Sequence, residues 1–183
     1  MPPSLSLPYS LRPATADELV LAVAIDDAAT LLFTEAGIVF DLAETHPFVI
    51  AEHERWQRAI EAKQLWFACH ATDAATPTGF SALARAGDSA YLDQLCVLPE
   101  HGRRGVGSLL LETACARCKE RGDSELWLTT YAHVPWNQPF YERHGFEVVP
   151  EIQCNAALRE LLAEQRAVLP FPEQRVAMAR KLA

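Results

Sequence analysis

The chain reads Val97-Leu-Pro-Glu-His-Gly-Arg-Arg-Gly-Val-Gly-Ser-Leu-Leu-Leu111, and this stretch decides the fold. An apolar run typical of a strand ends at Val97, a glycine-rich loop follows, and a helical pattern begins at once. Glycine lets the backbone curl inward, and the free N–H groups of a helix's first turn favour anions. Arg103 and Arg104 can add charge-assisted hydrogen bonds to phosphate oxygens. The stretch indicates a phosphate-binding loop, and an ordinary strand–helix connection with two surface arginines is the alternative.

Two familiar phosphate-binding motifs do not fit this loop. It lacks the Gly-Lys-Ser/Thr ending of a P-loop, and it has no Gly-x-Gly-x-x-Gly followed by an acidic residue about 20 positions later. A single phosphate-bearing cofactor, approached by backbone amides, is the remaining interpretation.

Three pieces in this order resemble the GCN5-related N-acetyltransferase (GNAT) superfamily: Leu95–Glu100, the loop Arg103–Ser108, and Phe140–Phe146. The similar segment runs from about Tyr91 to Pro150. The loop departs from the family pattern Gln/Arg-x-x-Gly-x-Gly/Ala because Gly102 fills its first position. The resemblance implies acetyl-CoA as the acyl donor, no metal, and pyrophosphate binding mainly by backbone N–H groups. The cofactor-binding residues that it implies are Leu95, Cys96, Val97, Gly102, Arg103, Arg104, Gly105, Val106, Gly107, Ser108 and Asn137.

Composition is that of an ordinary globular domain. The 183 residues fit one domain, residues 1–183, with half of them hydrophobic and 22% charged. The formal net charge is −8 and no basic stripe is present, which argues against nucleic acid as a partner. An acidic surface could favour amines, or it could serve solubility alone.

No apolar run reaches the roughly 18 to 20 residues that span a bilayer, and no basic region precedes the run 19–25. We therefore expect a cytoplasmic protein with no membrane partner. Five cysteines without an export signal indicate reduced thiols. Cys115 and Cys118 lie on or beside the apolar stripe of the helix after the loop, and no second Cys or His pair has zinc spacing. We expect small core residues there and no metal site.

Periodicity predicts an α/β (α+β) fold. The resemblance implies a mixed, mostly antiparallel central sheet with helices on both faces, and a cofactor core at about 91–150. A capping box at Thr15–Glu18 predicts a first helix of about 15 residues whose apolar side carries Leu19, Val20, Val23, Ala24, Asp27 and Leu31. Residues 72–78 read as a turn, and 156–166 as an inserted helix that could cover the substrate or form a homodimer contact. Strands are expected at 9–12, 65–70, 79–85, 90–97, 125–131, 146–149 and 175–180, and further helices at 49–62, 102–121 (with its loop) and 139–144.

Tyr141 is the candidate general acid. The resemblance implies that its hydroxyl lies near the cofactor sulfur, and a phenol of pKa about 10 stays protonated beside a thiolate leaving group of pKa about 8.5. The alternative is a ring that only packs beside Phe140 and Phe146. Relatives often carry Asn seven positions before this Tyr, where this chain has Val134. Asn137 could instead bond the pantetheine arm, or cap a short helix.

Asp93 is the candidate base, at a position where many relatives place a Glu that deprotonates the amine. Strand alternation puts Asp93 on one face with Tyr91, Leu95 and Val97. A carboxylate on an apolar face needs a partner or a function, so a salt bridge to an arginine is the alternative. Because Asp is shorter than Glu, we expect a water relay.

Family geometry implies that the backbone of 95–97 pairs with the pantetheine amides. That strand must then splay from the one beginning near Glu125, which leaves a free edge and a possible oxyanion donor. The acceptor site is expected from residues 30–60 and 131–137, with His133 and Trp136 as substrate residues, although both could be ordinary loop residues.

The function that follows is an acetyl-CoA-dependent N-acetyltransferase acting on an amine. We expect a small-molecule amine in preference to a protein N-terminus or lysine. A non-catalytic acyl-CoA-binding module and an interaction protein that uses helix 156–166 are the alternatives.

Overall fold

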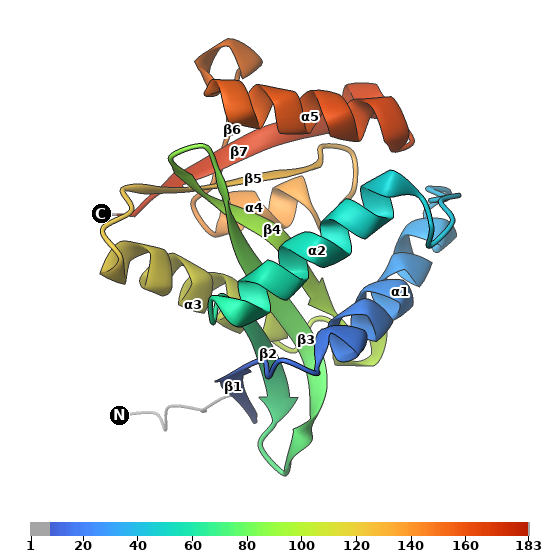
Figure 1. Ribbon diagram of the computed structural model, residues 1–183, viewed down its shortest axis with the longest axis vertical. Coiled ribbons are helices and arrows are strands. Elements are labelled where there is room, and N and C mark those ends of the chain that lie inside the picture. The colour runs from blue at the N-terminus through green and yellow to red at the C-terminus, as the bar shows by residue number, and fades with distance from the viewer. Residues whose placement is uncertain (1–7, 183) are drawn as a thin grey trace.

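The computed structural model describes residues 8–182. Its seven-stranded sheet has the order β1-β2-β3-β4-β5-β7-β6, and every neighbouring pair is antiparallel except β4 and β5 (Figure 1). The expected mixed, mostly antiparallel sheet is thereby confirmed. The strands are β1 (Tyr9–Pro13), β2 (Leu65–His70), β3 (Asp73–Ala86), β4 (Ser89–Val97), β5 (Glu125–Tyr131), β6 (Glu147–Val149) and β7 (Arg175–Lys181).

Helices cover both faces of the sheet, as expected. Trp56 packs with Phe67 and Phe80 under the first two helices, and Leu158 of the last helix packs on the same face. The third helix buries Leu111 against Leu92 and its neighbours on the opposite face, where the fourth helix also packs. The helices are α1 (Leu19–Glu35), α2 (Pro47–Glu61), α3 (Val106–Glu120), α4 (Gln138–Arg143) and α5 (Ala156–Val168).

The start of α1 differs from the capping-box prediction. Glu18 does reach back and accepts from the Thr15 N–H at 2.8 Å, but the Thr15 hydroxyl donates to Asp17 instead. The helix therefore begins at Leu19 with no side-chain cap. Glu18 also binds Arg12 at 2.7 Å, and this ion pair lowers the Glu18 pKa to about 2.

The predicted apolar side of α1 is wrong for Val20, Ala24, Asp27 and Leu31, which are exposed, whereas Leu19 and Val23 do pack against the core. The core holds Ala22, Ile25 and Ala29, whereas Val20 and Leu31 are 66% and 61% exposed. The physical reason is that α1 has two apolar sides. One of them, with Val20 and Val23, borders a cavity.

The turn predicted at 72–78 is also wrong, because β3 begins at Asp73. Residues 73–78 pair only with β2, since β4 reaches no further than the pair Gly79↔Val97. Pro77 is tolerated there because it lies on a free edge, where no ladder N–H is needed.

A β-bulge in β4 overturns the expected alternation around Asp93. Leu92 pairs with Leu83 and Gln94 with Ala82, so Asp93 is the extra residue. Asp93 and Gln94 consequently both reach the side of α1 and α2, where Asp93 bonds Trp56 and Gln94 bonds Asp26. Bulges next to functional sites commonly redirect a side chain in this way.

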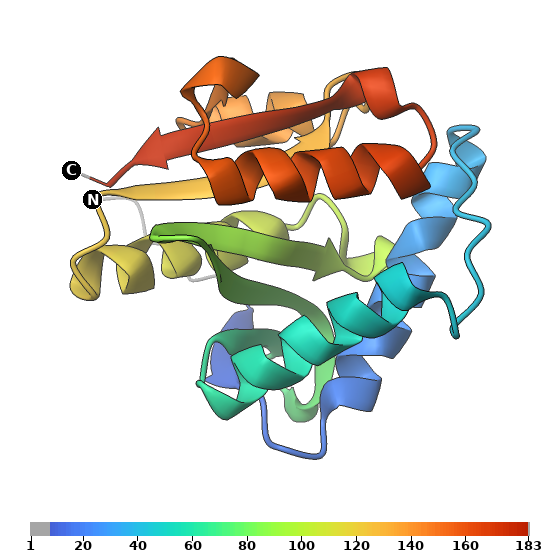
Figure 2. The same cartoon turned by 45° about the horizontal axis from the view of Figure 1, so that its top comes forward.

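Strands β4 and β5 separate along their length, as expected. Only Ala90↔Leu126 and Tyr91↔Trp127 pair between them. Figure 2 shows the two strands diverging from there, so that the end of β4 has a free edge. This opening lies between the two halves of the sheet and leads to the loop before α3.

Candidate active site

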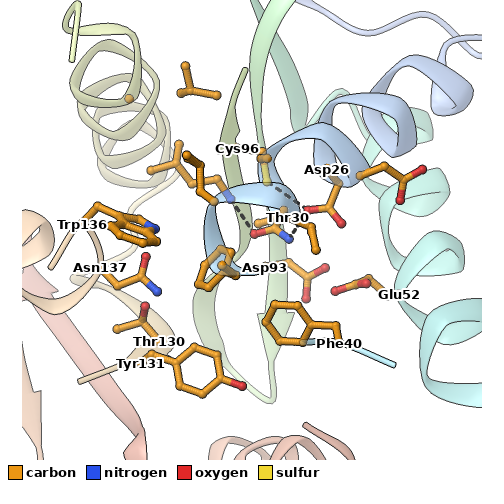
Figure 3. A pocket seen from close by; sticks show the side chains of 18 of the residues that line it. Asp26, Thr30, Phe40, Glu52, Asp93, Cys96, Thr130, Tyr131, Trp136 and Asn137 are labelled. Carbon is orange, nitrogen blue, oxygen red and sulfur yellow. Dashed lines mark hydrogen bonds between the residues drawn. The ribbon is translucent and has the colours of Figure 1, made fainter. Parts of the chain in front are cut away.

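A cavity of about 1510 Å³ occupies the opening between β4 and β5. Its walls come from α1 and α2 on one side, from β5, β7 and α5 on the other, and from the loop before α3 at one end (Figure 3). Ligand pockets usually measure about 300–1,000 Å³, so this one has room for a large cofactor and a second substrate.

The loop before α3 has the geometry of an anion site. Arg103 and Gly105 both have positive φ, 56° and 85°, which turns the backbone inward at the start of the helix. Gly105 occupies the N-cap position, and no side chain caps the helix. The N–H groups of the first turn, at Gly107 and Ser108 on the cavity wall, therefore remain for a ligand.

The cavity brings together most of the cofactor residues expected from the sequence. Arg104 is exposed and does not line it, and Val106 is buried in the core, so Val106 can contribute only its backbone. Those that line it are Leu95, Cys96, Val97, Gly102, Arg103, Gly105, Gly107, Ser108 and Asn137.

The free edge of β4 faces this cavity. The Leu95 N–H donates to the side-chain oxygen of Gln94 at 3.1 Å rather than to a neighbouring strand. Strand alternation gives Val97 the same orientation. These N–H groups point toward the cavity, where an amide-bearing arm or a developing oxyanion could replace the Gln94 oxygen at Leu95.

Tyr141 lines the cavity from α4. Its ring packs on Phe140 and Phe146, at centroid distances of 5.2 and 5.7 Å, so the packing alternative is also present. Among the described residues its hydroxyl has no hydrogen-bond partner, and burial raises its pKa well above the ordinary range. A neutral, unpartnered phenol is a competent proton donor.

The three residues predicted after β5 differ in whether they line the cavity. Asn137 is the N-cap residue of α4, but its side chain makes no capping hydrogen bond, so it stays available to the cavity that it lines. Trp136 lines the cavity and stacks on Phe33 at 5.7 Å. His133 lies off the cavity wall, packed between Tyr131 and Phe171.

Asp93 has the partners that a buried carboxylate requires. Arg55 Nε donates to one oxygen at 2.9 Å and Trp56 Nε1 to the other at 3.0 Å, and only 3% of the side chain is exposed. Burial raises its pKa, while Arg55 opposes the rise. The salt bridge to an arginine, which was the alternative to a catalytic role for Asp93, is therefore present.

Two further carboxyl groups, which the sequence analysis did not single out, lie near Asp93 (Figure 3). Asp26 of α1 accepts from Gln94 at 2.9 Å and from the Cys96 thiol at 3.0 Å. Burial raises the pKa of Asp26, and burial together with Asp26 raises that of Cys96.

Glu52 of α2 is the third group of this cluster, and it differs from the other two. It has no hydrogen-bond or ion-pair partner among residues 8–182. Burial, reinforced by the nearby charges of Asp26 and Asp93, raises its pKa to about 8, against the opposing charges of Arg55 and Arg175. Glu52 is therefore a carboxyl group on the cavity wall that exchanges a proton near neutral pH. Such groups are candidates for acid–base chemistry.

Metal and membrane sites receive no support from the part of the chain that the structure describes. Residues 8–182 contain no group of three or more His, Cys, Asp or Glu side chains arranged to hold a metal ion. Within the same range, no helix has the length and apolar character needed to cross a bilayer. All five cysteines are buried and free, and Cys115 and Cys118 are core residues as expected.

Comparison with known sequences identifies relatives. The sequence pattern of the "Acetyltransferase (GNAT) family" matches residues 29–146. The uncharacterized N-acetyltransferase YafP of Escherichia coli strain K12 is 33% identical over 108 residues. That match covers 58% of this chain and 62% of the relative, so it leaves more than a third of the relative's length unmatched.

Solved structures share the fold. An N-acetylglutamate synthase from Neisseria gonorrhoeae, complexed with coenzyme A and N-acetyl-glutamate, superimposes with a TM-score of 0.68 at 16% identity. The match covers 96% of this chain and 35% of that one. The ribosomal-protein-S18-alanine N-acetyltransferase from Escherichia coli gives a TM-score of 0.62 at 18% identity, over 96% of this chain and 94% of that one.

Proposed function

Because the chain belongs to the acetyltransferase (GNAT) family, we propose that it transfers an acetyl group from acetyl-CoA to the amine of a small molecule. One observation carries the proposal. A single cavity joins the uncapped N-terminus of α3 to the carboxyl group of Glu52 and the hydroxyl of Tyr141. A phosphate-binding end and two proton-exchanging groups thus share one space. The cavity is walled on both sides, which suits a small acceptor.

The residues present fit the cofactor. The first-turn N–H groups of α3 suit its phosphates, and the free edge of β4 suits the amides of its arm. When bound there, acetyl-CoA would supply the acetyl group as a thioester with a thiolate leaving group. The side chains of Asn137 and Trp136 would border the arm on the other side.

Side chains and backbone N–H groups of the cavity would handle charge and protons. Glu52 takes a proton from the acceptor ammonium, so that the amine can form the new C–N bond. Burial, reinforced by the nearby charges of Asp26 and Asp93, raises the pKa of Glu52 and so keeps this group basic near neutral pH. Tyr141 gives its proton to the sulfur as the C–S bond breaks and takes back the proton that the new amide nitrogen loses, while the edge N–H groups of β4 stabilise the carbonyl oxygen.

Acetyl-CoA should stabilise the protein against heat. A ligand at 100 times its Kd adds about 2.7 kcal/mol, which corresponds to a rise of roughly 5 to 10 °C in Tm for a chain of this size. Thermal unfolding with and without acetyl-CoA measures this, followed by detection of released thiol with a panel of amines. An unchanged Tm at millimolar acetyl-CoA would contradict the proposed function.

Tyr141→Phe should lower kcat by about 10- to 100-fold while leaving the Kd of acetyl-CoA within about twofold. The loss lies at the lower end for general acids, because a thiolate of pKa about 8.5 departs readily. Steady-state kinetics and calorimetric titration of acetyl-CoA measure the two quantities. The ring packing on Phe140 and Phe146 is kept in this variant, so equal turnover would remove the hydroxyl from the mechanism.

A further inference from the structure

Arg175 is a buried cation on the cavity wall opposite the acidic cluster. It is the first residue of β7, pairs with Tyr131 of β5, and is only 8% exposed. Among the described residues no carboxylate forms an ion pair with it. A buried charge is costly unless it is paired, so a guanidinium in this position calls for an anionic partner.

The surroundings hold the guanidinium without neutralising it. Nη2 donates to the Gln165 side chain at 2.7 Å and to Thr129 at 3.1 Å, and the Tyr131 ring lies 4.7 Å from the guanidinium carbon. Nε is buried with no partner, and Nη1 makes no hydrogen bond to any described residue. Neutral acceptors thus fix the orientation and leave part of the guanidinium's donor capacity unused.

An acidic and a basic side chain face this one cavity. The positive charge of Arg175 lies near enough to Glu52 to oppose the rise of the Glu52 pKa, so the two groups interact across the space between them. On the acidic side, Asp93 is matched by Arg55, whereas Glu52 has no ion-pair partner among the described residues. The cavity therefore presents one unmatched carboxyl group and one unmatched guanidinium.

We propose that the acceptor is a zwitterion, an amino acid or amino-acid-like amine whose carboxylate binds Arg175 while its ammonium faces Glu52. This inference rests on the proposed acetyltransferase function and narrows its substrate class. Arginine suits a carboxylate because its planar fork offers several donors to two oxygens. The aromatic side chains of Phe40, Tyr131 and Trp136 also line the cavity and suit an apolar substituent of the acceptor (Figure 3).

Paired acceptors that differ only in the carboxylate test the proposal. Each pair is an amino acid and the amine obtained by its decarboxylation, such as phenylalanine with phenethylamine and methionine with 3-(methylthio)propylamine. For at least one pair, the wild-type protein should use the amino acid with a kcat/KM about 10- to 100-fold higher, the range expected for hydrogen bonds to a charged group. The same amino acid should raise Tm in the presence of CoA, and its amine should not.

Substitution of Arg175 tests whether this residue causes the preference for the amino acid. Arg175→Met should erase the preference for the amino acid, so that the two members of a pair have kcat/KM values within about threefold of each other in this variant. Arg175→Lys keeps the charge without the fork and should restore part of the preference. Arg180→Met is the matched control on the same strand, because Arg180 pairs with Glu112 outside this cavity, and it should keep the full preference.

The outcomes separate the two proposals. Equal use and equal binding of both members of every pair by the wild-type protein would overturn the zwitterion proposal and leave acetyl transfer standing. A preference that survives in Arg175→Met would overturn it as well. Failure of acetyl-CoA to change Tm, with no thiol released for any acceptor, would count against the proposed function itself. The amino-acid effect on Tm tests the Arg175 site even then, and it does not depend on a folded variant.

Discussion

Gly107→Val is expected to weaken acetyl-CoA binding by at least about 100-fold, or ~2.7 kcal/mol, in a protein that still folds. Gly107 lies in the first turn of α3 and on the cavity wall. A Cβ there would meet the Phe140 ring at 3.5 Å and Val97 at 3.8 Å, which are ordinary contacts. The two further methyl groups of valine would extend into the space from which phosphates approach the backbone N–H groups. Calorimetric titration of acetyl-CoA measures the loss.

Two companion variants isolate the steric effect. Gly107→Ala adds only the Cβ that the structure accommodates, so it should bind acetyl-CoA more tightly than the valine variant does. Ala116→Val introduces the same β-branched residue on the exposed face of α3 and should bind like the wild-type protein. Wild-type affinity in Gly107→Val, with an unchanged Tm, would mean that the phosphates bind elsewhere.

Local signals in the sequence predicted most of the elements. The bounds of β2 and β5 agree with the apolar runs at 65–70 and 125–131. Gly122, with φ of 86°, follows α3 at a position where glycine commonly ends a helix, and Gly87 forms the turn between β3 and β4. In each case the residues that fix the conformation are neighbours in the chain.

The errors concern features that distant parts of the chain decide. Which side of α1 is buried depends on where the cavity lies, and its composition is apolar on both sides. The bulge at Asp93 depends on the register between β3 and β4, for which the residues give no local sign. Because a bulge reverses the alternation beyond it, one unseen extra residue was enough to place Leu95 and Val97 on the wrong face relative to Asp93.

The sequence named individual residues at the cofactor end of the cavity, but at the acceptor end it gave mainly the ranges 30–60 and 131–137 and singled out neither Glu52 nor Arg175. A glycine-rich loop carries its own signal, whereas Glu52 and Arg175 come together only in the folded chain. One signal was available for Glu52: it lies one helical turn before the buried Trp56, so an acidic residue stands on the inward side of α2. No comparable sequence signal pointed to Arg175, apart from its position at the start of a predicted strand.

Glu52→Gln is expected to lower kcat by about 10²- to 10⁴-fold, the range typical of a general base. The side chain keeps its size and loses its ability to accept a proton. The wild-type kcat/KM should rise with pH through an apparent pKa near 8, because only the ionised carboxylate accepts the proton. That titration should be absent from the variant. Glu54→Gln is the matched control, since Glu54 is an exposed residue of the same helix, and it should change neither quantity.

Stability gives an independent measure of the same group. The folded pKa of Glu52, about 8, lies above the ordinary value of 4.5, so the folded state holds a proton that the unfolded state releases. The stability that this proton provides is complete below about pH 4.5 and is lost as pH rises through 8. At pH 9 the wild-type protein therefore buries a charge that Glu52→Gln does not, and the variant should have the higher Tm. Equal Tm values at pH 9, with kcat unchanged, would show that Glu52 is ionised in contact with water and has no part in proton transfer.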